Sequence, residues 1–339
     1  MILIEIEVLM DKVDAILESY SGNTLFNDKR VLQANYSPDE IPHREKQIES
    51  VAAILAPVLR GDKVSNLFCY GKTGTGKTLS VQHVGGRIAE KIRQSGQDLK
   101  FLYINCKLRK VANTENRIIA ELIRAMGGKI PDTGLPTDSV YSKFVEMIDD
   151  KKQIVILVLD EIDQAVKNIS DNFIYTLTRM NSELKNAQIS LIGISNSLTF
   201  MDNLDPRVRS SLGEEELVFP PYNALQLQNI LKNRAERAFR EGVLDEGVIA
   251  KCAAFAAREH GDARRALDLL RVAGELAERE GSKKVKQKHI DSANEKIERD
   301  KMIDVIESEP TQFQLVLYAI VELSDDNKVR QKKLDGEGA

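Results

Sequence analysis

The stretch Gly71-Lys-Thr-Gly-Thr-Gly-Lys-Thr78 constrains this chain more than any other, because it fits the pattern G-x-x-x-x-G-K-[ST] at every fixed position. An apolar run at residues 66–70 precedes it, and apolar residues at helical spacing follow it from Val81 to Ile92. In a loop between a strand and a helix, such glycines let successive backbone N–H groups point at one anion, and the helix adds its positive dipole end. The stretch therefore predicts a phosphate-binding loop.

The side chains of this loop suit a nucleotide with bound magnesium. Lys77 is expected to reach the β- and γ-phosphates, and Thr78 to give its hydroxyl to Mg²⁺. The nucleotide-contacting residues expected in the loop are Gly71, Thr73, Gly74, Thr75, Gly76, Lys77, Thr78 and Leu79.

Length and composition bound the other possibilities. A chain of 339 residues predicts two packed domains and a further fragment. The net charge of −4 excludes a protein coated with nucleic acid over its whole surface and leaves room for local basic patches. Three scattered cysteines without C-x-x-C spacing predict reduced, partly buried thiols. The apolar start carries Glu5 and Glu7 and has no basic head, so we expect no signal peptide and a cytoplasmic protein.

A second element of the site follows the six apolar residues 154–159, which predict a parallel strand covered on both faces. This strand ends in Asp160 and Glu161, at the edge where open α/β sheets bind ligands. Asp160 is expected in the Mg²⁺ shell, and Glu161 to orient and deprotonate the attacking water. The alternative is an ordinary strand end followed by a capped helix.

Two further polar residues lie where a nucleotide site would use them. Asn196 follows the apolar strand 189–194, and its amide could bond the γ-phosphate or the lytic water, although an isolated Asn there is commonly a turn residue. Arg264 lies in the first turn of a predicted helix with Asp262 as its N-cap, which would aim the arginine toward the cleft. The alternative for the adjacent pair Arg264 and Arg265 is a solvated helix face.

The order of these elements predicts the organisation of the chain. A helical segment at 1–30 is followed by a nucleotide-binding α/β domain at 31–222, whose fifth strand lies at 216–219. Strand signals then stop, and four helices with glycines between them predict an all-α lid domain at 223–301. Residues 302–339 hold one further helix at about 311–323 and a polar tail.

The order of the motifs over about residues 30–300 resembles that of an AAA+ ATPase. A phosphate loop comes first, followed by a strand that ends in Asp-Glu, a strand followed by Asn, and a helical domain with Gly-Asp-x-Arg. Within that class the chain is similar to the archaeal replication initiators related to origin recognition complex subunit 1 and cell-division-control protein 6. The residues that carry this resemblance are Tyr36-x-Pro38, Ile41-Pro-His-Arg-Glu45, Leu204-Asp-Pro-Arg-Val-Arg-Ser-Ser-Leu212 and Gly261-Asp-Ala-Arg264.

The resemblance implies a three-layer α/β/α fold with a five-stranded parallel sheet, an all-α lid and a winged-helix domain, of which residues 302–339 would be an incomplete fragment. It implies Asn196 and Arg264 as first and second sensors, catalytic together with Glu161. The residues that it places around the adenine are Ile41, Pro42, His43, Arg44, Tyr222 and Ile230.

The resemblance also implies a DNA-contacting helical insertion between the second strand and the Asp-Glu strand. A basic run opens that interval, with five cations and one acid from Lys100 to Arg117, a local balance of +4. The candidate DNA contacts are Lys107, Arg109, Lys110 and Arg117; the alternative is that these side chains only keep an exposed turn and helix soluble.

One departure concerns hydrolysis. In many AAA+ proteins the box after the first sensor ends in Ser-Arg, and that arginine completes a neighbour's site; here Ser211 occupies the matching position, and Arg207 or Arg209 could serve instead. Because such arginines contribute on the order of 10³–10⁵ in rate elsewhere, we expect slow hydrolysis.

The expected function is an ATP-binding replication initiator that binds origin duplex DNA. It would act as a nucleotide-controlled switch for recruitment of the replicative helicase, using ATP/ADP and Mg²⁺ with weak ATPase activity. Its partners would include other initiator subunits, with nucleoid association and no membrane. Two alternatives stay open: a clamp-loader-like or remodelling ATPase that needs a ring of subunits, and a regulatory nucleotide-binding module without DNA binding.

Overall fold

The computed structural model describes residues 24–95, 98–107, 114–131 and 134–334. They fall into two compact units. The first, here called the α/β unit, comprises Arg30–Glu236 and Cys252–Leu267. The second, the helical unit, comprises residues 24–29, Arg237–Lys251 and residues 268–334 of the described chain.

A five-stranded sheet forms the centre of the α/β unit. Its strands lie in the order β2-β3-β4-β1-β5, and every pair of neighbours is parallel, as the sequence predicts. The strand bounds are β1 Leu67–Tyr70, β2 Leu99–Asn105, β3 Ile154–Asp160, β4 Gln188–Ser195 and β5 Glu215–Val218.

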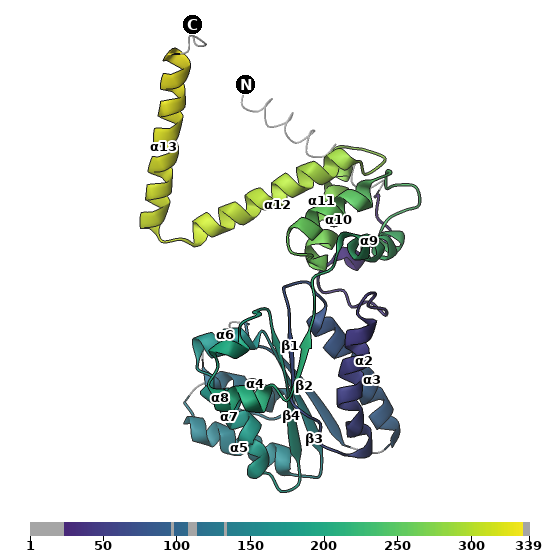
Figure 1. Ribbon diagram of the computed structural model, residues 1–339, viewed down its shortest axis with the longest axis vertical. Coiled ribbons are helices and arrows are strands. Elements are labelled where there is room, and N and C mark those ends of the chain that lie inside the picture. Colours follow the sequence, from purple (N-terminus) through teal and green to yellow (C-terminus); the bar gives the residue numbers. More distant parts are fainter. Residues whose placement is uncertain (1–23, 96–97, 108–113, 132–133, 335–339) are drawn as a thin grey trace, which may run out of the picture. The chain divides into compact units, whose positions relative to one another are not determined.

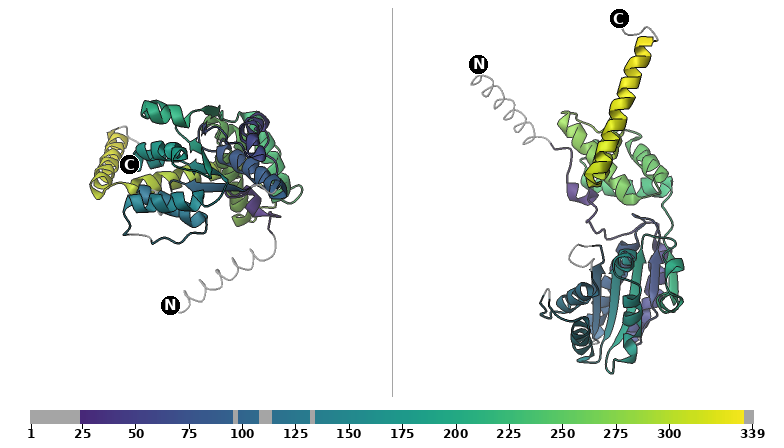
Figure 2. Two further views of the ribbon diagram at one scale, coloured as in Figure 1. Left: turned by 90° about the horizontal axis from the view of Figure 1, so that it is seen from below. Right: turned by 90° about the vertical axis from the view of Figure 1, so that its left-hand side faces the viewer.

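Helices cover both faces of this sheet, which gives the predicted α/β/α layers (Figure 1 and Figure 2). Strand β3 is buried along its whole length, and its alternate residues join two different cores, as the twofold side-chain period of a strand requires. Val155 lies in one core with α4 (Glu115–Ala125), α5 (Thr137–Asp149), α6 (Ile162–Asn168), α7 (Asn172–Arg179) and α8 (Pro206–Leu212). Ile156 lies in the other core with α2 (Glu45–Leu55) and α3 (Lys77–Ser95).

The remaining helices follow β5 in the chain. Their bounds are α9 Ala224–Ala238, α10 Val248–Arg258, α11 Ala263–Arg279, α12 Gln287–Ser308 and α13 Thr311–Leu334. Short 3-10 turns lie at Lys29–Leu32 (η1), Ala56–Arg60 (η2), Met180–Ser182 (η3) and Met201–Asn203 (η4). Helices α9 to α12 overlap the four predicted helices, but α12 continues to Ser308, past the predicted end of the lid at residue 301, and α13 runs past the predicted end at residue 323. Among the described residues, no helix combines the length and apolar character needed to cross a membrane.

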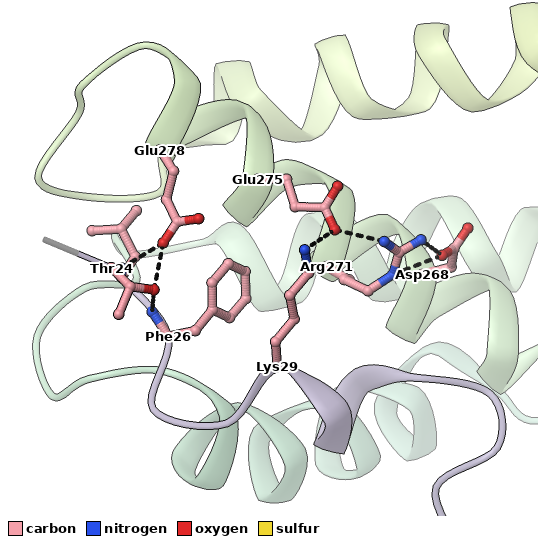
Figure 3. Close-up of polar contacts among 8 residues, drawn as sticks. Thr24, Phe26, Lys29, Asp268, Arg271, Glu275 and Glu278 are labelled. Carbon is pink, nitrogen blue, oxygen red and sulfur yellow. Dashed lines mark hydrogen bonds and ion pairs between the residues drawn. The ribbon is translucent and has the colours of Figure 1, made fainter. Parts of the chain in front are cut away.

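Of the predicted helical segment 1–30, residues 24–28 are not helical, residues 29 and 30 begin the 3-10 turn η1, and residues 1–23 lie outside the described residues. Residues 24–28 attach instead to the other parts of the helical unit (Figure 3). The Thr24 hydroxyl and the Leu25 backbone N–H both donate to Glu278 Oε1, each at 2.7 Å. The ring of Phe26 stacks on Phe239 with 4.5 Å between centroids.

A series of ion pairs also joins Lys29 to residues of α11 (Figure 3). The Lys29 ammonium lies 2.5 Å from Glu275 Oε1, and the same carboxylate oxygen accepts from Arg271 at 2.6 Å. Arg271 in turn pairs with Asp268 one turn earlier on the helix. Residues 24–29 are thus held to α11 by both apolar and ionic contacts.

In the α/β unit, one carboxylate joins the end of α5 to the segment before β4. Asp149 Oδ1 accepts the backbone N–H groups of Lys185 at 3.0 Å, Asn186 at 2.6 Å and Ala187 at 2.8 Å. These donors, the Lys185 N–H foremost, lower the pKa of Asp149 below its usual range. Because the ionised form is favoured in the folded state, the carboxylate contributes stability above its unfolded-state pKa and loses it as pH falls through the folded-state pKa.

We therefore expect Asp149→Asn to lower the urea midpoint at pH 7. The difference from the parent should begin to shrink as the pH falls below about 4, the unfolded-state pKa of Asp, and should vanish below the folded-state pKa, where both proteins are neutral at this position. Asp150→Asn, which removes the neighbouring exposed carboxylate, is the control. A difference that stays constant from pH 7 to pH 3 would contradict the assignment.

Candidate functional site

The carboxyl ends of three strands converge at one edge of the sheet. The register pairs Tyr70 of β1 with Ser195 of β4, and Asp160 of β3 with Ile194 of β4. The segments that follow β1, β3 and β4 therefore start at the same level, at the edge where parallel α/β sheets place ligands.

The predicted phosphate loop connects β1 to α3. Gly74 and Gly76 have φ angles of 71° and 87°, the left-handed region that glycine adopts without strain. The other loop residues expected to contact nucleotide, Gly71, Thr73, Thr75, Thr78 and Leu79, lie between the end of β1 and the first turn of α3.

Lys77, the first residue of α3, folds back over this loop. Its ammonium donates to the carbonyl oxygens of Gly71 and Lys72 and to Asn196 Oδ1, each at 2.8 Å. Burial lowers the pKa of Lys77 to about 8; the charge of Asp160 opposes this shift, and the charge of Arg264 adds to it. The structure thus brings Lys77 and Asn196 into direct contact.

Asp160 is held by three donors. The Thr78 hydroxyl and the Tyr103 hydroxyl both donate to Asp160 Oδ2 at 2.7 Å, and the backbone N–H of Glu161 donates to Oδ1 at 2.9 Å. Tyr103 lies on β2, next to β3, and burial raises its pKa. Sequence reasoning missed Tyr103, because its relation to Asp160 depends on a strand pairing that no local pattern reveals.

Glu161 has a φ of 54°, which is unusual for a residue with a side chain and stores about 1–3 kcal/mol of strain. Its carboxylate lies near two residues at the end of β2: Asn105 Nδ2 donates to Oε1 at 3.5 Å, and Lys107 Nζ is 3.7 Å from Oε2. The conformation turns the Glu161 carboxylate away from the line of β3 toward the end of β2. Asn105 is a second contact that the sequence pattern does not indicate.

Hydrogen bonds at the end of β4 support Asn196. The Ser195 hydroxyl donates to Asp163 Oδ1 at 2.8 Å and accepts the Ser197 backbone N–H at 3.0 Å. Asp163 belongs to the same acidic segment as Asp160, so one segment after β3 supports both the magnesium candidate and the tip of β4. This arrangement fixes the backbone on both sides of Asn196.

The residues expected around the adenine lie beside the phosphate loop. Arg44 is 2% exposed; its Nε donates to Thr75 O at 2.7 Å, and its guanidinium carbon lies 3.7 Å from the centroid of the Tyr222 ring. Pro42 and His43 form the turn before Arg44, and the His43 ring contacts Asn229 at 3.1 Å. Ile41 and Ile230 are buried. Arg44 therefore links the 41–44 segment to the loop and to Tyr222.

Arg264 and its neighbour differ in their surroundings. Arg264 is exposed in the first turn of α11, whereas Arg265 is buried and pairs with Glu259 at 3.0 Å. The predicted N-cap is present, because Asp262 Oδ1 accepts the Arg264 backbone N–H at 2.7 Å. Of the two adjacent arginines, only Arg264 presents its side chain at the surface.

The structure describes two of the four candidate DNA contacts. Lys107 is largely exposed beside Glu161, and Arg117 is exposed on α4. Arg109 and Lys110 lie outside the described residues.

The two arginines considered as substitutes at the Ser211 box are exposed and paired with acids of their own unit. Arg207 donates to both oxygens of Asp205, at 3.0 and 3.1 Å. Arg209 lies 3.6 Å from Asp202. Arg207 thus makes two hydrogen bonds to its acid, whereas Arg209 makes one longer ion pair.

Comparison with known proteins identifies the family of the chain. Residues 62–201 match the AAA domain family, and residues 228–295 match the Cdc6 AAA+ ATPase-type lid domain. The ORC1-type DNA replication protein of Thermococcus onnurineus is 51% identical over 322 residues, 94% of this chain and 77% of the relative.

Two solved structures are similar. The ORC1 protein of Aeropyrum pernix, solved in complex with DNA, is 48% identical with a TM-score of 0.80, covering 88% of this chain and 77% of that one. The ORC2 protein of Aeropyrum pernix, solved in ADPNP–ADP complexes, is 26% identical with a TM-score of 0.68, covering 79% and 72%. With half of its aligned residues identical to a curated relative over nearly its whole length, this chain belongs to the ORC1-type DNA replication protein family of AAA+ ATPases.

Proposed function

We propose that this chain is an ATP-binding replication initiator that binds origin duplex DNA and switches helicase recruitment according to the bound nucleotide. The observation that supports nucleotide binding best is the convergence of Lys77, Thr78, Asp160 and Asn196 through hydrogen bonds of 2.7–2.8 Å at one sheet edge. Family membership supports the same conclusion, since the similar ORC2 protein was solved in ADPNP–ADP complexes.

The donor set fits a magnesium nucleotide. Backbone N–H groups of the loop, the Lys77 ammonium and the Arg264 guanidinium would bind the phosphates, and the Thr78 hydroxyl and Asp160 carboxylate are oxygen ligands of the kind that Mg²⁺ takes. Bound Mg²⁺ would neutralise charge on the phosphates. Lys77 already uses three acceptors of the protein, so phosphate oxygens would replace bonds that the lysine makes to the loop and to Asn196.

The remaining polar residues have separate tasks in this proposal. Glu161 accepts a proton from the attacking water, and Asn196, held by Ser195 and Asp163, orients that water or a phosphate oxygen. Ile41, Tyr222 and the other residues of the predicted adenine site would enclose the base. We infer slow hydrolysis, because Ser211 replaces the expected arginine and both nearby arginines are paired with acids.

The DNA part of the proposal draws on relatives. Curated relatives carry the name ORC1-type DNA replication protein, and the ORC1 protein of Aeropyrum pernix was solved in complex with DNA. We infer that this chain also binds duplex DNA, with other initiator subunits and the replicative helicase as protein partners. The exposed cations Lys107 and Arg117 are the described candidates for phosphate contacts.

Lys77→Ala should weaken binding of a fluorescent ATP analogue about 10- to 100-fold, because it removes charge-assisted hydrogen bonds of about 1.5–3 kcal/mol. Lys72→Ala, at an exposed loop lysine, is the control for removal of a positive charge. Unchanged binding by folded Lys77→Ala would overturn the nucleotide site.

Glu161→Gln should bind the analogue as the parent does and hydrolyse ATP about 10²–10⁴-fold more slowly, because an amide cannot accept the proton of water.

Tyr103→Phe should raise the Mg²⁺ concentration needed for half-maximal ATP binding about 10-fold or more. The variant keeps the ring and deletes one of the two hydroxyl groups that orient Asp160 Oδ2, and loss of such outer-shell partners reduces metal affinity by about that much. Tyr70→Phe, at the end of β1, is the matched hydroxyl deletion. An equal Mg²⁺ titration for parent and Tyr103→Phe would show that the hydroxyl does not matter for metal binding.

Charge reversal of Lys107, Arg109 and Lys110 to Glu should weaken duplex DNA binding. It should also lower the log–log salt slope by about 0.9 for each DNA phosphate that the protein no longer neutralises. The control reverses three exposed lysines elsewhere in the α/β unit, Lys46, Lys63 and Lys91. A double reversal without Lys107 separates the DNA effect from the charge beside Glu161. If the triple variant keeps the parent's affinity and slope, these residues are not the DNA surface.

A further inference from the structure

Helix α11 begins in direct contact with the phosphate loop. The Ala263 backbone N–H donates to the carbonyl oxygen of Gly74 at 3.3 Å. Gly74 has a φ of 71°, and a Cβ added there would overlap the carboxylate of Asp262. Only glycine permits this approach, so the contact depends on the residue type at position 74 as well as on the carboxylate.

The Asp262 carboxylate also organises the first turn of α11. Its Oδ1 accepts the backbone N–H groups of Arg264 at 2.7 Å and of Arg265 at 3.2 Å. An N-cap of this kind satisfies donors that have no partner within the helix and sets the direction in which the first turn leaves the loop. One carboxylate therefore touches the phosphate loop and fixes the backbone of Arg264.

Gly261, the residue before Asp262, contacts the segment that carries Tyr222. The Tyr222 backbone N–H donates to Gly261 O at 3.2 Å, and a Cβ at Gly261 would overlap the Tyr222 carbonyl. The turn that leads into α11 is thus packed between the segment that carries Tyr222 and the tip of the phosphate loop. This packing leaves little room for the first turn of α11 to shift without breaking a contact to Gly74 or to Tyr222.

Arg264 leaves this turn as an exposed side chain whose charge lowers the pKa of Lys77, in addition to the larger effect of burial. Because Asp262 accepts the Arg264 backbone N–H and also lies against Gly74, the Arg264 side chain starts beside the phosphate loop. Arg265 points elsewhere and pairs with Glu259. The backbone turn that Asp262 caps thus sets where the Arg264 side chain starts relative to the loop.

We propose that Asp262 is a positioning residue: it holds the first turn of α11 against Gly74 and thereby places Arg264 to contact the γ-phosphate. Discrimination between ATP and ADP therefore depends on Asp262. The inference rests on the proposed function, because it requires ATP at this loop. Asp262 touches no reacting atom in this scheme. Its effect is carried by Arg264, which contacts a group that ATP has and ADP lacks.

The test compares ATP and ADP affinities by isothermal titration in the presence of Mg²⁺. Asp262→Ala should reduce ATP affinity about 10-fold while ADP affinity changes less than about twofold, and Asp262→Asn, whose side chain can still cap a helix, should restore most of the difference. Arg264→Ala should show the same selective loss. The double variant Asp262→Ala/Arg264→Ala should lose no more than Arg264→Ala alone, because both changes remove one interaction.

Asp268→Ala is the control, since it removes a carboxylate on the same helix that pairs with Arg271. Parallel loss of both nucleotides in Asp262→Ala, an unchanged ATP-to-ADP ratio, or additive losses in the double variant would each overturn the inference while leaving the nucleotide site in place. A parent protein that binds neither nucleotide would overturn the proposed function and this inference with it.

Discussion

The hydrogen bond from Thr78 to Asp160 joins the first turn of α3, which follows β1, to the end of β3, and the rest of the site depends on it. Strand β4 lies between β1 and β3, so the bond forms only because three parallel strands end at the same level. That order places Asn196, which follows β4, between the loop and Asp160, where it accepts from Lys77. The strand order thus assembles four side chains from three separate segments, which a phosphate loop alone would not do.

Charge explains why Lys77 and its neighbours stay together. A buried ammonium is unfavourable unless its donors are satisfied, and Lys77 meets this requirement with two carbonyl oxygens and the amide oxygen of Asn196. Burial still lowers the pKa of Lys77, and Asp160 partly offsets that shift. Phosphate oxygens can take over these acceptor positions, so the arrangement prepares the lysine for an anion instead of holding it in an unrelated ion pair.

The sequence predicts most of the fold and part of the site, for reasons that differ by element. The phosphate loop and the β3 end are local patterns whose neighbouring strand and helix confirm the context. Sequence reasoning missed helices α6 and α7, because seven- and eight-residue helices leave little periodic signal. The contacts of Tyr103 with Asp160 and of Asn105 with Glu161 join β2 to β3, and pairing between strands so far apart in the chain cannot be inferred from a local pattern.

Burial distinguishes two cations that are fixed in place, Arg44 and Arg265, from the exposed cation Lys107. Arg44 and Arg265 are almost fully buried and bound at 3.0 Å or less, and breaking such contacts would leave a buried charge uncompensated. Lys107 is 70% exposed and 3.7 Å from Glu161, and an exposed pair of this kind contributes only about 0–1 kcal/mol. Little free energy therefore holds Lys107 at Glu161, so its place in the structure does not argue against a contact with DNA phosphates.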